Sequence, residues 1–334
     1  MKQKLIHVTD DGPGITRRRR GRGFSYYTPD GTLIRDPEER ARIEALAVPP
    51  AYEEVWISPD PRGHLQATGR DAGGRKQYRY HPDWQALRAQ RKFGDLAAFG
   101  RALPRLRRRI AVDLRAPAGS RRLALAAVLA LLDRAALRVG NACYAAENGS
   151  YGASTLLGRH VRFDGQDITI VFPGKHGARV EAHLQGRRLA RALHRIHDLP
   201  GAALFSWRDG EDILHTLRSE DINETLHELC GKDASAKTFR TWKGTHAAFA
   251  LAAQTDGALR ITDMAEVAAA CLHNSPAIAR KSYIHPSVIA LAEMVPQDRT
   301  ARLAALDPPD LSGLHAHEAE LIALLEGSVL SSVR

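Results

Sequence analysis

Near its C-terminus the chain reads Ser275-Pro276-Ala277-Ile278-Ala279-Arg280-Lys281-Ser282-Tyr283-Ile284-His285-Pro286. Tyr283, in this stretch, follows the basic pair Arg280-Lys281. An isolated tyrosine has a pKa near ~10, so forming its anion at neutral pH costs roughly 4 kcal/mol. Neighbouring positive charge recovers part of that cost. The stretch therefore predicts a helix over residues 276–283 that ends on a candidate nucleophile.

Three cationic residues upstream complete a set suited to attack on a phosphodiester. Negative charge spreads over the non-bridging oxygens in the transition state, and arginines aimed there provide electrostatic stabilisation. A lysine on a hairpin tip can protonate the leaving oxygen. The residues and their motifs are Arg138 in Leu137-Arg138-Val139-Gly140-Asn141, Lys175 in Pro173-Gly174-Lys175-His176-Gly177, and Arg240 in Lys237-Thr238-Phe239-Arg240-Thr241-Trp242.

Each of these residues also has an ordinary explanation. A lone tyrosine is more often a packing residue, and Lys175 could be a solvated turn residue. Arg138 could compensate a helix dipole, and Arg240 could form a cation–π pair with Trp242. Their order along a basic chain favours catalysis instead. The set predicts an enzyme that cuts and rejoins DNA through a phosphotyrosine.

Length and charge are consistent with this prediction. A chain of 334 residues exceeds the ~250–300 at which a single core stops growing, so two domains are expected. The net charge of +10 favours a polyanionic partner such as nucleic acid over a role in solubility alone. The hydrophobic fraction of 44% indicates a folded protein rather than a disordered one.

Cysteine usage and hydropathy limit the cell compartments in which the protein is expected to work. The three cysteines are far apart and lack paired spacing, which excludes a disulfide framework and a cysteine zinc site. No hydrophobic stretch of the signal-peptide type occurs at the N-terminus. The longest apolar run, residues 123–132, is half the length that a membrane span needs. We expect a cytoplasmic protein associated with the nucleoid.

The pattern along the chain predicts an α+β fold with two domains. A small β-rich domain is expected over residues 1–87, with strands at 53–57, 64–69 and 77–80. A larger, mainly helical catalytic domain is expected over residues 88–334, containing a three-stranded meander at 161–163, 167–172 and 178–183. The helices expected in this domain are 93–110, 121–136 (capped by Ser120), 186–197, 219–230, 236–253, 263–273, 276–283, 286–294 and 313–326, after a helical stretch that begins at 84–91.

Two short features were open to a functional interpretation. The run Arg17–Arg22 is either a solvated tail or a phosphate-contacting segment, since aromatic residues follow it at once. The pairs His194/His197 and His315/His317 are expected to lie on solvated helix faces, because no carboxylate completes a metal triad. No metal site is predicted, and the stretch 12–17 lacks the lysine and spacing of a phosphate-binding loop.

Over residues 16–286 the chain resembles the type IB DNA topoisomerases, in particular their small poxvirus and bacterial members. The catalytic motifs quoted above carry the resemblance together with Lys281-Ser282-Tyr283. Two earlier segments add to it: Val48-Pro49-Pro50-Ala51-Tyr52-Glu53-Glu54-Val55-Trp56-Ile57 and Gly74-Arg75-Lys76-Gln77-Tyr78-Arg79-Tyr80.

The resemblance implies a role for each catalytic residue. Tyr283 would attack and form a 3′-phosphotyrosine, and Arg138 and Arg240 would bind the non-bridging oxygens. Lys175 would protonate the departing 5′-hydroxyl. The family usually has a histidine nine residues before the tyrosine, where this chain has Asn274. An amide can donate a hydrogen bond to phosphate but carries no charge.

His273 is adjacent to Asn274, but neighbouring residues on a helix point about a hundred degrees apart. We therefore expect Asn274 to be the donor and His273 to be a core or surface residue.

The resemblance also implies how the enzyme works on DNA. Duplex DNA is the expected partner, held in a two-domain clamp by a monomer that relaxes supercoils by swivelling. No cofactor is expected, neither ATP nor an obligatory metal. The DNA-contacting residues would be Arg75, Lys76, Gln77 and Tyr78, from the segment that lies against the major groove in the family, and Tyr144, which would contact a phosphate.

Two alternatives remain open at this point. A tyrosine site-specific recombinase shares the same catalytic logic, but recombinases typically carry His-x-x-Arg where this chain has Lys237-x-x-Arg240. A non-catalytic DNA-binding protein would fit the basic composition equally well. The second alternative predicts that Tyr283→Phe changes no activity.

Overall fold

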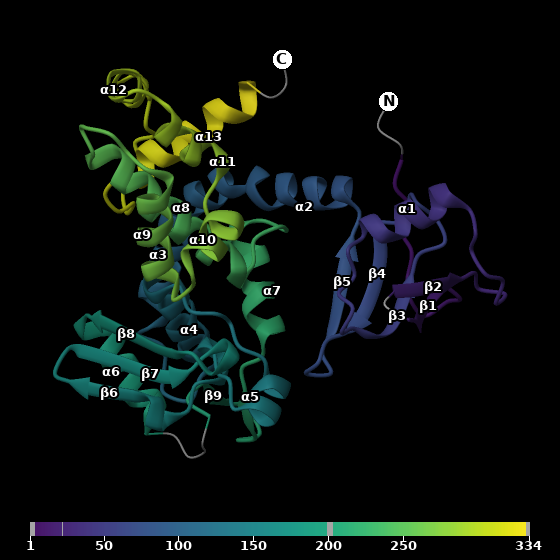
Figure 1. Cartoon of the computed structure of the whole chain (residues 1–334). Coiled ribbons are helices and arrows are strands. Elements are labelled where there is room, and N and C mark those ends of the chain that lie inside the picture. The colour runs from purple at the N-terminus through teal and green to yellow at the C-terminus, as the bar shows by residue number, and fades with distance from the viewer. Residues whose placement is uncertain (1–3, 22, 199–202, 332–334) are drawn as a thin grey trace. The chain divides into compact units, whose positions relative to one another are not determined.

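In the computed structural model, the described residues are 4–21, 23–198 and 203–331. The chain divides into two compact units, Met1–Phe93 and Gly94–Arg334. The helix α2 (Pro82–Gly94) crosses this division, and the boundary expected after residue 87 lies inside it. The α+β class is confirmed, with strands concentrated in the first unit and helices in the second (Figure 1).

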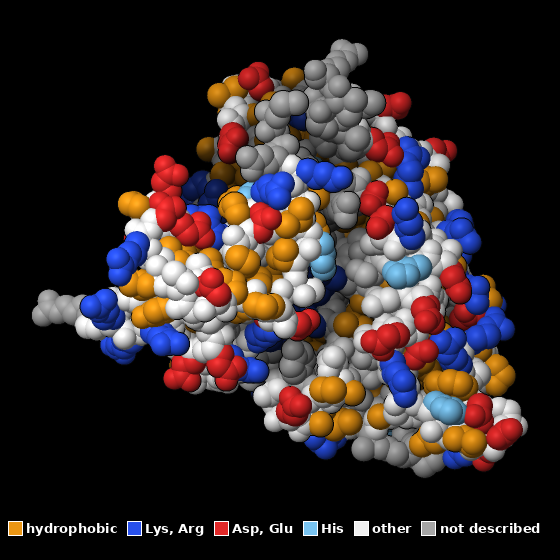
Figure 2. All heavy atoms as spheres, turned by 90° about the vertical axis from the view of Figure 1, so that its right-hand side faces the viewer, with side chains coloured by type: hydrophobic (Ala, Val, Ile, Leu, Met, Phe, Trp, Pro, Cys, Tyr) orange, Lys and Arg blue, Asp and Glu red, His pale blue; other side chains and the backbone are white. Residues whose placement is uncertain are grey.

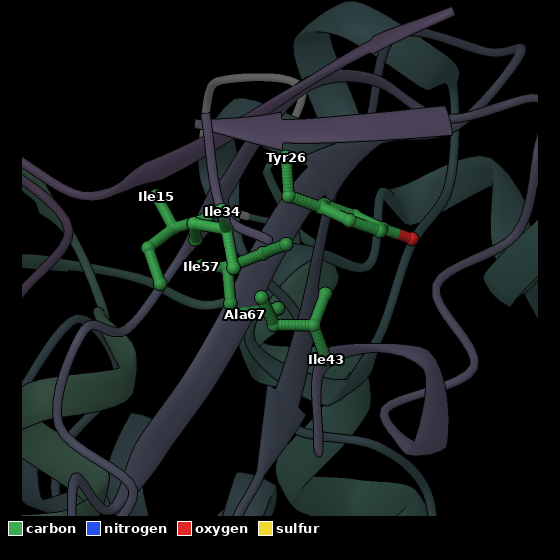
Figure 3. Packing of buried hydrophobic residues seen from close by; sticks show 6 residues of the cluster. All are labelled: Ile15, Tyr26, Ile34, Ile43, Ile57 and Ala67. Atoms are coloured by element: carbon green, nitrogen blue, oxygen red, sulfur yellow. The ribbon is translucent and has the colours of Figure 1, made fainter. Parts of the chain in front are cut away.

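The N-terminal unit contains a five-stranded antiparallel sheet, the helix α1 (Pro37–Ala45) and most of α2. The three strands expected from alternation are confirmed to within one residue as β3 (Glu53–Ile57), β4 (Leu65–Arg70) and β5 (Lys76–Tyr80). Two further strands, β1 (Ile15–Arg20) and β2 (Gly23–Tyr27), complete the order β2-β1-β3-β4-β5. A small core lies beneath the sheet, formed by Ile15, Tyr26, Ile34, Ile43, Ile57 and Ala67 (Figure 3).

The arginine-rich run is mostly strand β1. A free tail is therefore wrong for residues 15–20, whereas Arg22 lies outside the described residues. The guanidinium of Arg17 donates to the carbonyls of Val48, Pro49 and Tyr52 at 3.0, 2.7 and 2.8 Å. Its carbon also lies 4.3 Å from the centre of the Phe24 ring. Arg17 thus holds the loop before β3 in place, because these loop carbonyls need donors.

The C-terminal unit is mainly helical and is built around α4 (Arg121–Ala135), which is buried from Leu123 to Asp133. Ser120 caps this helix as expected, with its hydroxyl accepting from the Leu123 amide at 3.3 Å. The other helices of this unit are α3 (Leu96–Asp113), α5 (Ala142–Asn148), α6 (Arg187–His197), α7 (Ser219–Cys230), α8 (Ala236–Gln254), α9 (Ile261–Leu272), α10 (Pro276–Tyr283), α11 (Pro286–Ile289), α12 (Pro296–Ala304) and α13 (Glu318–Ser331).

The expected meander is confirmed as an antiparallel sheet of β6 (Val161–Asp164), β7 (Asp167–Pro173) and β8 (Arg179–Gln185). Both α4 and α6 pack against this sheet (Figure 1). The helix expected to begin at Asn141 is confirmed as α5, whereas the short hairpin β9 (Ser206–Arg208) and β10 (Leu214–Thr216) and the helix α12 were not expected. The predicted helix 286–294 is instead α11 followed by a 3-10 turn, Ala290–Glu293. Among the described helices, none has both the length and the apolar character required to span a membrane.

A buried ionic network joins α3, α4 and α13. Arg107 donates to both oxygens of Asp133 at 2.9 and 3.0 Å and to both oxygens of Glu318 at 2.6 and 2.9 Å. Glu318 also accepts from the indole nitrogen of Trp242 at 3.1 Å. Burial alone would raise the pKa of Glu318, but the hydrogen bonds and charge of Arg107 outweigh burial and lower the pKa to about 2. The network ties the C-terminal helix to α8.

Replacing Glu318 by Gln should destabilise the C-terminal unit by roughly 3 kcal/mol at neutral pH, because it breaks a buried, hydrogen-bonded ion pair. The pKa of Glu318 is lower in the folded protein than its ordinary value of 4.5, so its stabilisation is complete above that value and is lost as pH falls towards 2. The difference in free energy of unfolding between wild type and E318Q, measured by urea denaturation, should therefore shrink over this range. A difference that is constant with pH would contradict this account.

Candidate active site

Tyr283 is the last residue of α10, and α8 holds its backbone in place. The hydroxyl of Thr245 donates to the Tyr283 carbonyl at 3.0 Å and accepts from the His285 amide at 3.1 Å. A Cβ at Gly244 would lie 2.9 Å from the Tyr283 carbonyl oxygen and 3.0 Å from its Cβ. A glycine at this position therefore lets α10 approach α8 closely. The side chain of Tyr283 is half-buried.

Arg240 lies on α8 directly beside Tyr283. Its guanidinium carbon is 5.1 Å from the centre of the tyrosine ring, and its side chain is 3% exposed. Burial would raise the pKa of Tyr283, but a hydrogen bond with Arg240 and the charges of Arg240, Arg138 and Lys237 together lower it below the ordinary tyrosine value. These cationic neighbours therefore reduce the free-energy cost of forming the anionic, nucleophilic phenolate.

Arg240 also connects the ends of two other helices. One terminal nitrogen donates to the carbonyl of Ala136 at 2.5 Å, and the other donates to the carbonyl of Leu272 at 2.9 Å. Ala136 caps α4 and His273 caps α9, both in the left-handed conformation, with φ of 49° and 50°. The terminal carbonyls of these helices lack intrahelical partners, and a buried guanidinium satisfies them. The Nε atom of Arg240 is buried and has no hydrogen-bond partner.

Arg138 follows the end of α4 in a tightly held loop. Its carbonyl accepts from the Ala153 amide at 2.7 Å. Gly140 adopts a φ of 95°, and a Cβ at Gly152 would lie 2.5 Å from the Gly140 nitrogen. Two backbone segments approach so closely here that a side chain would not fit between them, which accounts for the glycine in the Leu-Arg-Val-Gly-Asn motif. Burial and the neighbouring charge of Arg240 lower the pKa of Arg138.

Asn274 is in contact with Arg138, as the catalytic interpretation requires. Its Oδ1 accepts from the Nη2 of Arg138 at 2.5 Å, while its Nδ2 is buried and without a hydrogen-bond partner. The helical spacing from which His273 was expected to be a core or surface residue does not hold. Helix α9 ends at Leu272, so helical spacing does not apply, and His273 lines the same pocket as Arg138 and Arg240. Burial and the two arginines lower its pKa.

The residues that line this pocket come from six separate segments of the chain. The hollow has a volume of only about 10 Å³, about the space of one water molecule. A phosphate group therefore requires side chains to move. The lining residues are Leu137, Arg138, Tyr151, Phe172, Gly174, Val180, Arg240, Leu272 and His273.

Lys175 is close to this pocket in the chain but does not line it. It stands exposed at the tip between β7 and β8, directly after Gly174, which is a lining residue. The tip is a tight turn in which His176 and Gly177 both have positive φ, at 63° and 73°. The structure thus brings Arg138, Arg240, Asn274 and Tyr283 together and places Lys175 at the rim.

The residues expected to touch DNA lie mostly on β5, in the N-terminal unit. Arg75 and Gln77 bond to the carboxylate of Asp71 at 3.1 and 2.9 Å, and Lys76 pairs with Asp10 at 2.6 Å. Tyr78 is 48% exposed and stacks on Tyr80. A phosphate would have to compete with these two carboxylates for the cationic groups.

Tyr144 belongs to α5, but its side chain lies outside the described residues. On the face seen in Figure 2, Lys and Arg side chains are interspersed with Asp and Glu, so net charge alone does not locate the DNA.

The histidine pairs do not form a metal centre in the part of the chain that the structure describes, where no three His, Cys, Asp or Glu side chains come together at ligand distance. His194 stacks on Phe163, with ring centres 3.9 Å apart. His317 contacts Gln254 at 3.1 Å.

Comparison with known proteins identifies the family. Residues 81–286 match the eukaryotic DNA topoisomerase I catalytic core, and residues 23–71 match the bacterial DNA topoisomerase IB N-terminal domain. The chain belongs to the type IB DNA topoisomerases. It is 31% identical over 233 residues to DNA topoisomerase 1B of Acanthamoeba polyphaga mimivirus, covering 69% of each protein. It is thus an enzyme of this class, acts on duplex DNA, and works in a compartment that contains DNA.

Sequence reasoning missed three residues of this topoisomerase site. Gly244 and Thr245 position the tyrosine backbone, and His273 lines the pocket. Gly244 and Thr245 lie about one helical turn after Arg240. A glycine next to a hydroxyl-bearing residue in a helix is a sequence signal of close helix packing. His273 could be found only by locating the end of α9.

Thr245→Val keeps the side-chain shape and removes the hydrogen bond to Tyr283. The loss of about 1 kcal/mol of positioning should slow single-turnover DNA cleavage roughly fivefold, with affinity for the same duplex unchanged. Quench-flow on a duplex with one cleavage site measures the rate. Thr241→Val, one helical turn earlier, is the matched control and should leave the rate within twofold of wild type. Equal losses in both variants would assign the effect to general destabilisation.

Proposed function

We propose that Tyr283 is the nucleophile with which this enzyme relaxes supercoiled duplex DNA. The phenol loses its proton and its oxygen attacks the scissile phosphorus. The bond between phosphorus and the 5′-oxygen breaks, leaving a 3′-phosphotyrosine and a free 5′-hydroxyl. The nicked strand swivels around the intact one, and the 5′-hydroxyl then attacks phosphorus and releases the tyrosine.

One observation carries this proposal. The half-buried Tyr283 lies against the buried guanidinium of Arg240, and cationic neighbours lower its pKa although burial acts in the opposite direction. A purely structural tyrosine needs no such neighbours, because its neutral form is stable at physiological pH. Perturbed titration beside specific charged partners is typical of a reacting group.

Specific atoms are available for the phosphate. The Nε of Arg240 and the Nδ2 of Asn274 are buried donors without partners, and both belong to residues that adjoin Arg138 or Tyr283. Leaving such donors unsatisfied costs free energy, which an incoming oxyanion would recover. We assign these two donors and the guanidinium of Arg138 to the non-bridging oxygens.

Lys175 is the proposed general acid. Its ammonium protonates the 5′-oxygen as the bond to phosphorus breaks, and the tip must bring it inward on DNA because it is exposed in the free protein. Two residues of left-handed φ make this tip a defined turn that can move as a unit.

The remaining parts of the proposal follow from the chemistry. The phosphotyrosine conserves the free energy of the phosphodiester, so religation needs no ATP. Arginine and lysine supply the charge that a divalent ion supplies elsewhere, so no metal is obligatory. We propose a monomer, since one chain holds all of the named residues, and a cytoplasmic, nucleoid-associated enzyme of bacterial type. The residues of β5 are proposed to contact the duplex, with residues 1–87 and 88–334 acting as the two arms of a clamp.

Tyr283→Phe should abolish covalent adduct formation while leaving salt-sensitive binding to duplex DNA unchanged. Wild type and variant are incubated with end-labelled duplex in EDTA, denatured, and separated by gel electrophoresis; a shifted band appears only with wild type. Tyr151→Phe, at a tyrosine that lines the pocket beside Arg138 and Arg240, is the control and should retain the adduct. An adduct in the Y283F protein would overturn the assignment. Relaxation of plasmids that carry no paired sites separates a topoisomerase from a recombinase.

Asn274→Asp isolates the donor at this position. The carboxylate keeps an oxygen for Arg138 but has no N–H for the phosphate and adds a negative charge. Single-turnover cleavage should fall by about 10²-fold or more, with the melting temperature close to that of wild type. Asn274→His, which restores the family's usual donor, should cleave at a rate closer to wild type than N274D does. Full activity in N274D would show that the amide does not act on the phosphate.

A further inference from the structure

His273 has a left-handed backbone conformation at a position where glycine is usual. It caps α9 with a φ of 50° and a ψ of 52°. The amide of the next residue, Asn274, donates to the carbonyl of Ala269 at 3.1 Å, five residues back along the chain, as in a Schellman motif. This conformation is unfavourable for a residue with a Cβ atom, and residues held in it tend to lie at functional sites. The backbone therefore points to a use for the imidazole ring.

The ring of His273 has unused hydrogen-bonding capacity inside the catalytic pocket. His273 is half-buried and lines the hollow together with Arg138 and Arg240, whose charges both act on its ring. None of the other described residues forms a hydrogen bond with either ring nitrogen. Both nitrogens are donors when the ring is protonated. An anion that enters the hollow thus meets a potential third cation beside the two guanidinium groups.

The charges that surround His273 in the free protein are positive. Arg240 faces the ring from α8 and Arg138 faces it from the loop after α4, while Lys175 stands at the tip between β7 and β8. Among the described residues, no carboxylate lines the pocket. Burial and the two arginines therefore keep the pKa of His273 below its ordinary value of 6.5, and the ring is neutral at physiological pH.

The helices packed against α9 add no compensating negative charge. Every charged side chain on α8 and α10 is a lysine or an arginine. Two further titratable groups are neutral at physiological pH, because burial lowers the pKa of His246 on α8 and raises the pKa of Cys271 on α9. The phenol of Tyr283 is the remaining titratable group at this site, and it acquires charge only when it reacts.

A bound phosphodiester reverses this electrostatic balance. Its non-bridging oxygens carry one negative charge, and the attacking phenolate brings a second as the transition state forms. Negative charge beside a histidine favours its protonated form. The ring can take a proton from solvent as the phosphate enters, and it keeps this proton through cleavage because it donates a hydrogen bond and transfers no hydrogen.

We propose that His273 becomes protonated when the scissile phosphate enters and is then a third cationic donor to the non-bridging oxygens. The inference rests on the proposed function, because it assumes that this pocket receives the phosphate that Tyr283 attacks. The amide of Asn274 and the two arginines do not change their charge near neutral pH, whereas an imidazole does. His273 therefore gives cleavage a dependence on pH that its neighbours in the pocket do not give.

The variant H273N tests the charge, because asparagine tolerates the left-handed backbone and donates a hydrogen bond but does not titrate. Its matched control is H317N, since His317 also has a positive φ, of 64°, and is not among the residues that line the pocket. Single-turnover cleavage of a duplex with one site should slow at least about tenfold in H273N at neutral pH. The rate in H317N should match wild type.

The pH profile separates charge from shape. The ratio of the wild-type cleavage rate to the H273N rate should fall as pH rises from about 6 to about 9, because the imidazole loses its proton in this range. Ionisation of Tyr283 affects both proteins equally and cancels in the ratio. H273G, which removes the ring and the backbone strain together, should melt no lower than wild type and cleave no faster than H273N.

Proton uptake on binding gives a readout that a structural role would not change. Calorimetry of duplex binding at neutral pH, in two buffers of different ionisation enthalpy, measures the protons taken up. The Y283F protein, which should bind without cleaving, should take up as much as about one proton more than Y283F/H273N.

Two kinds of failure can be told apart. Wild-type cleavage rates in H273N or H273G, a rate ratio that is constant with pH, or equal proton uptake by the two Y283F proteins would overturn the role of His273. An equal loss of rate in H317N would overturn it as well. Failure of the proposed function would appear as an absent covalent adduct in wild type, or as an adduct in Y283F.

Discussion

The guanidinium of Arg240 is the group on which the rest of this active site depends. It satisfies the carbonyls of Ala136 and Leu272, at the ends of α4 and α9, and lies against the ring of Tyr283. Arg138 and Asn274 follow those two helix ends within two residues, so fixing the ends also fixes the side chains that we propose to contact the phosphate. A buried arginine is costly unless its donors are used. Here the helix termini supply the acceptors, and one group serves both folding and catalysis.

Close backbone approach is the second constraint. Gly152 beside Gly140 and Gly244 beside Tyr283 leave no room for a side chain. These contacts allow segments from distant parts of the sequence to enclose a pocket of about 10 Å³. In this small pocket Arg240 is already hydrogen-bonded to backbone carbonyls, as expected for an enzyme without its substrate. Substrate binding must therefore exchange hydrogen bonds as well as form them.

The sequence predicted the elements better than their connections. Alternation and turn residues located β3 to β8, and the cap of α4 was recognisable from Ser120. Strand β1 was not recognised, because four successive arginines conceal the pairing that Ile15 and Arg17 make on one face. The order of the motifs predicted the proposed catalytic residues. It did not predict that His273 lines the pocket, because this depends on where α9 changes to the left-handed conformation. That change occurs next to the carbonyl of Leu272, which accepts a tertiary hydrogen bond from Arg240.

The contact of Glu318 with Trp242 bears on what counts as the catalytic core. The match to the family's catalytic core ends at residue 286, yet Glu318 lies beyond it and bonds a side chain only two positions from Arg240. Helix α13 packs on α3 and α8, so the segment after Tyr283 supports α8, the helix that carries Arg240. A fragment that ends at residue 286 would keep the residues proposed for catalysis but lose the contact of Glu318 with Trp242, and Arg107 and Asp133 would be left open to water. The functional boundary of this enzyme is therefore set by packing and lies downstream of its last reactive group.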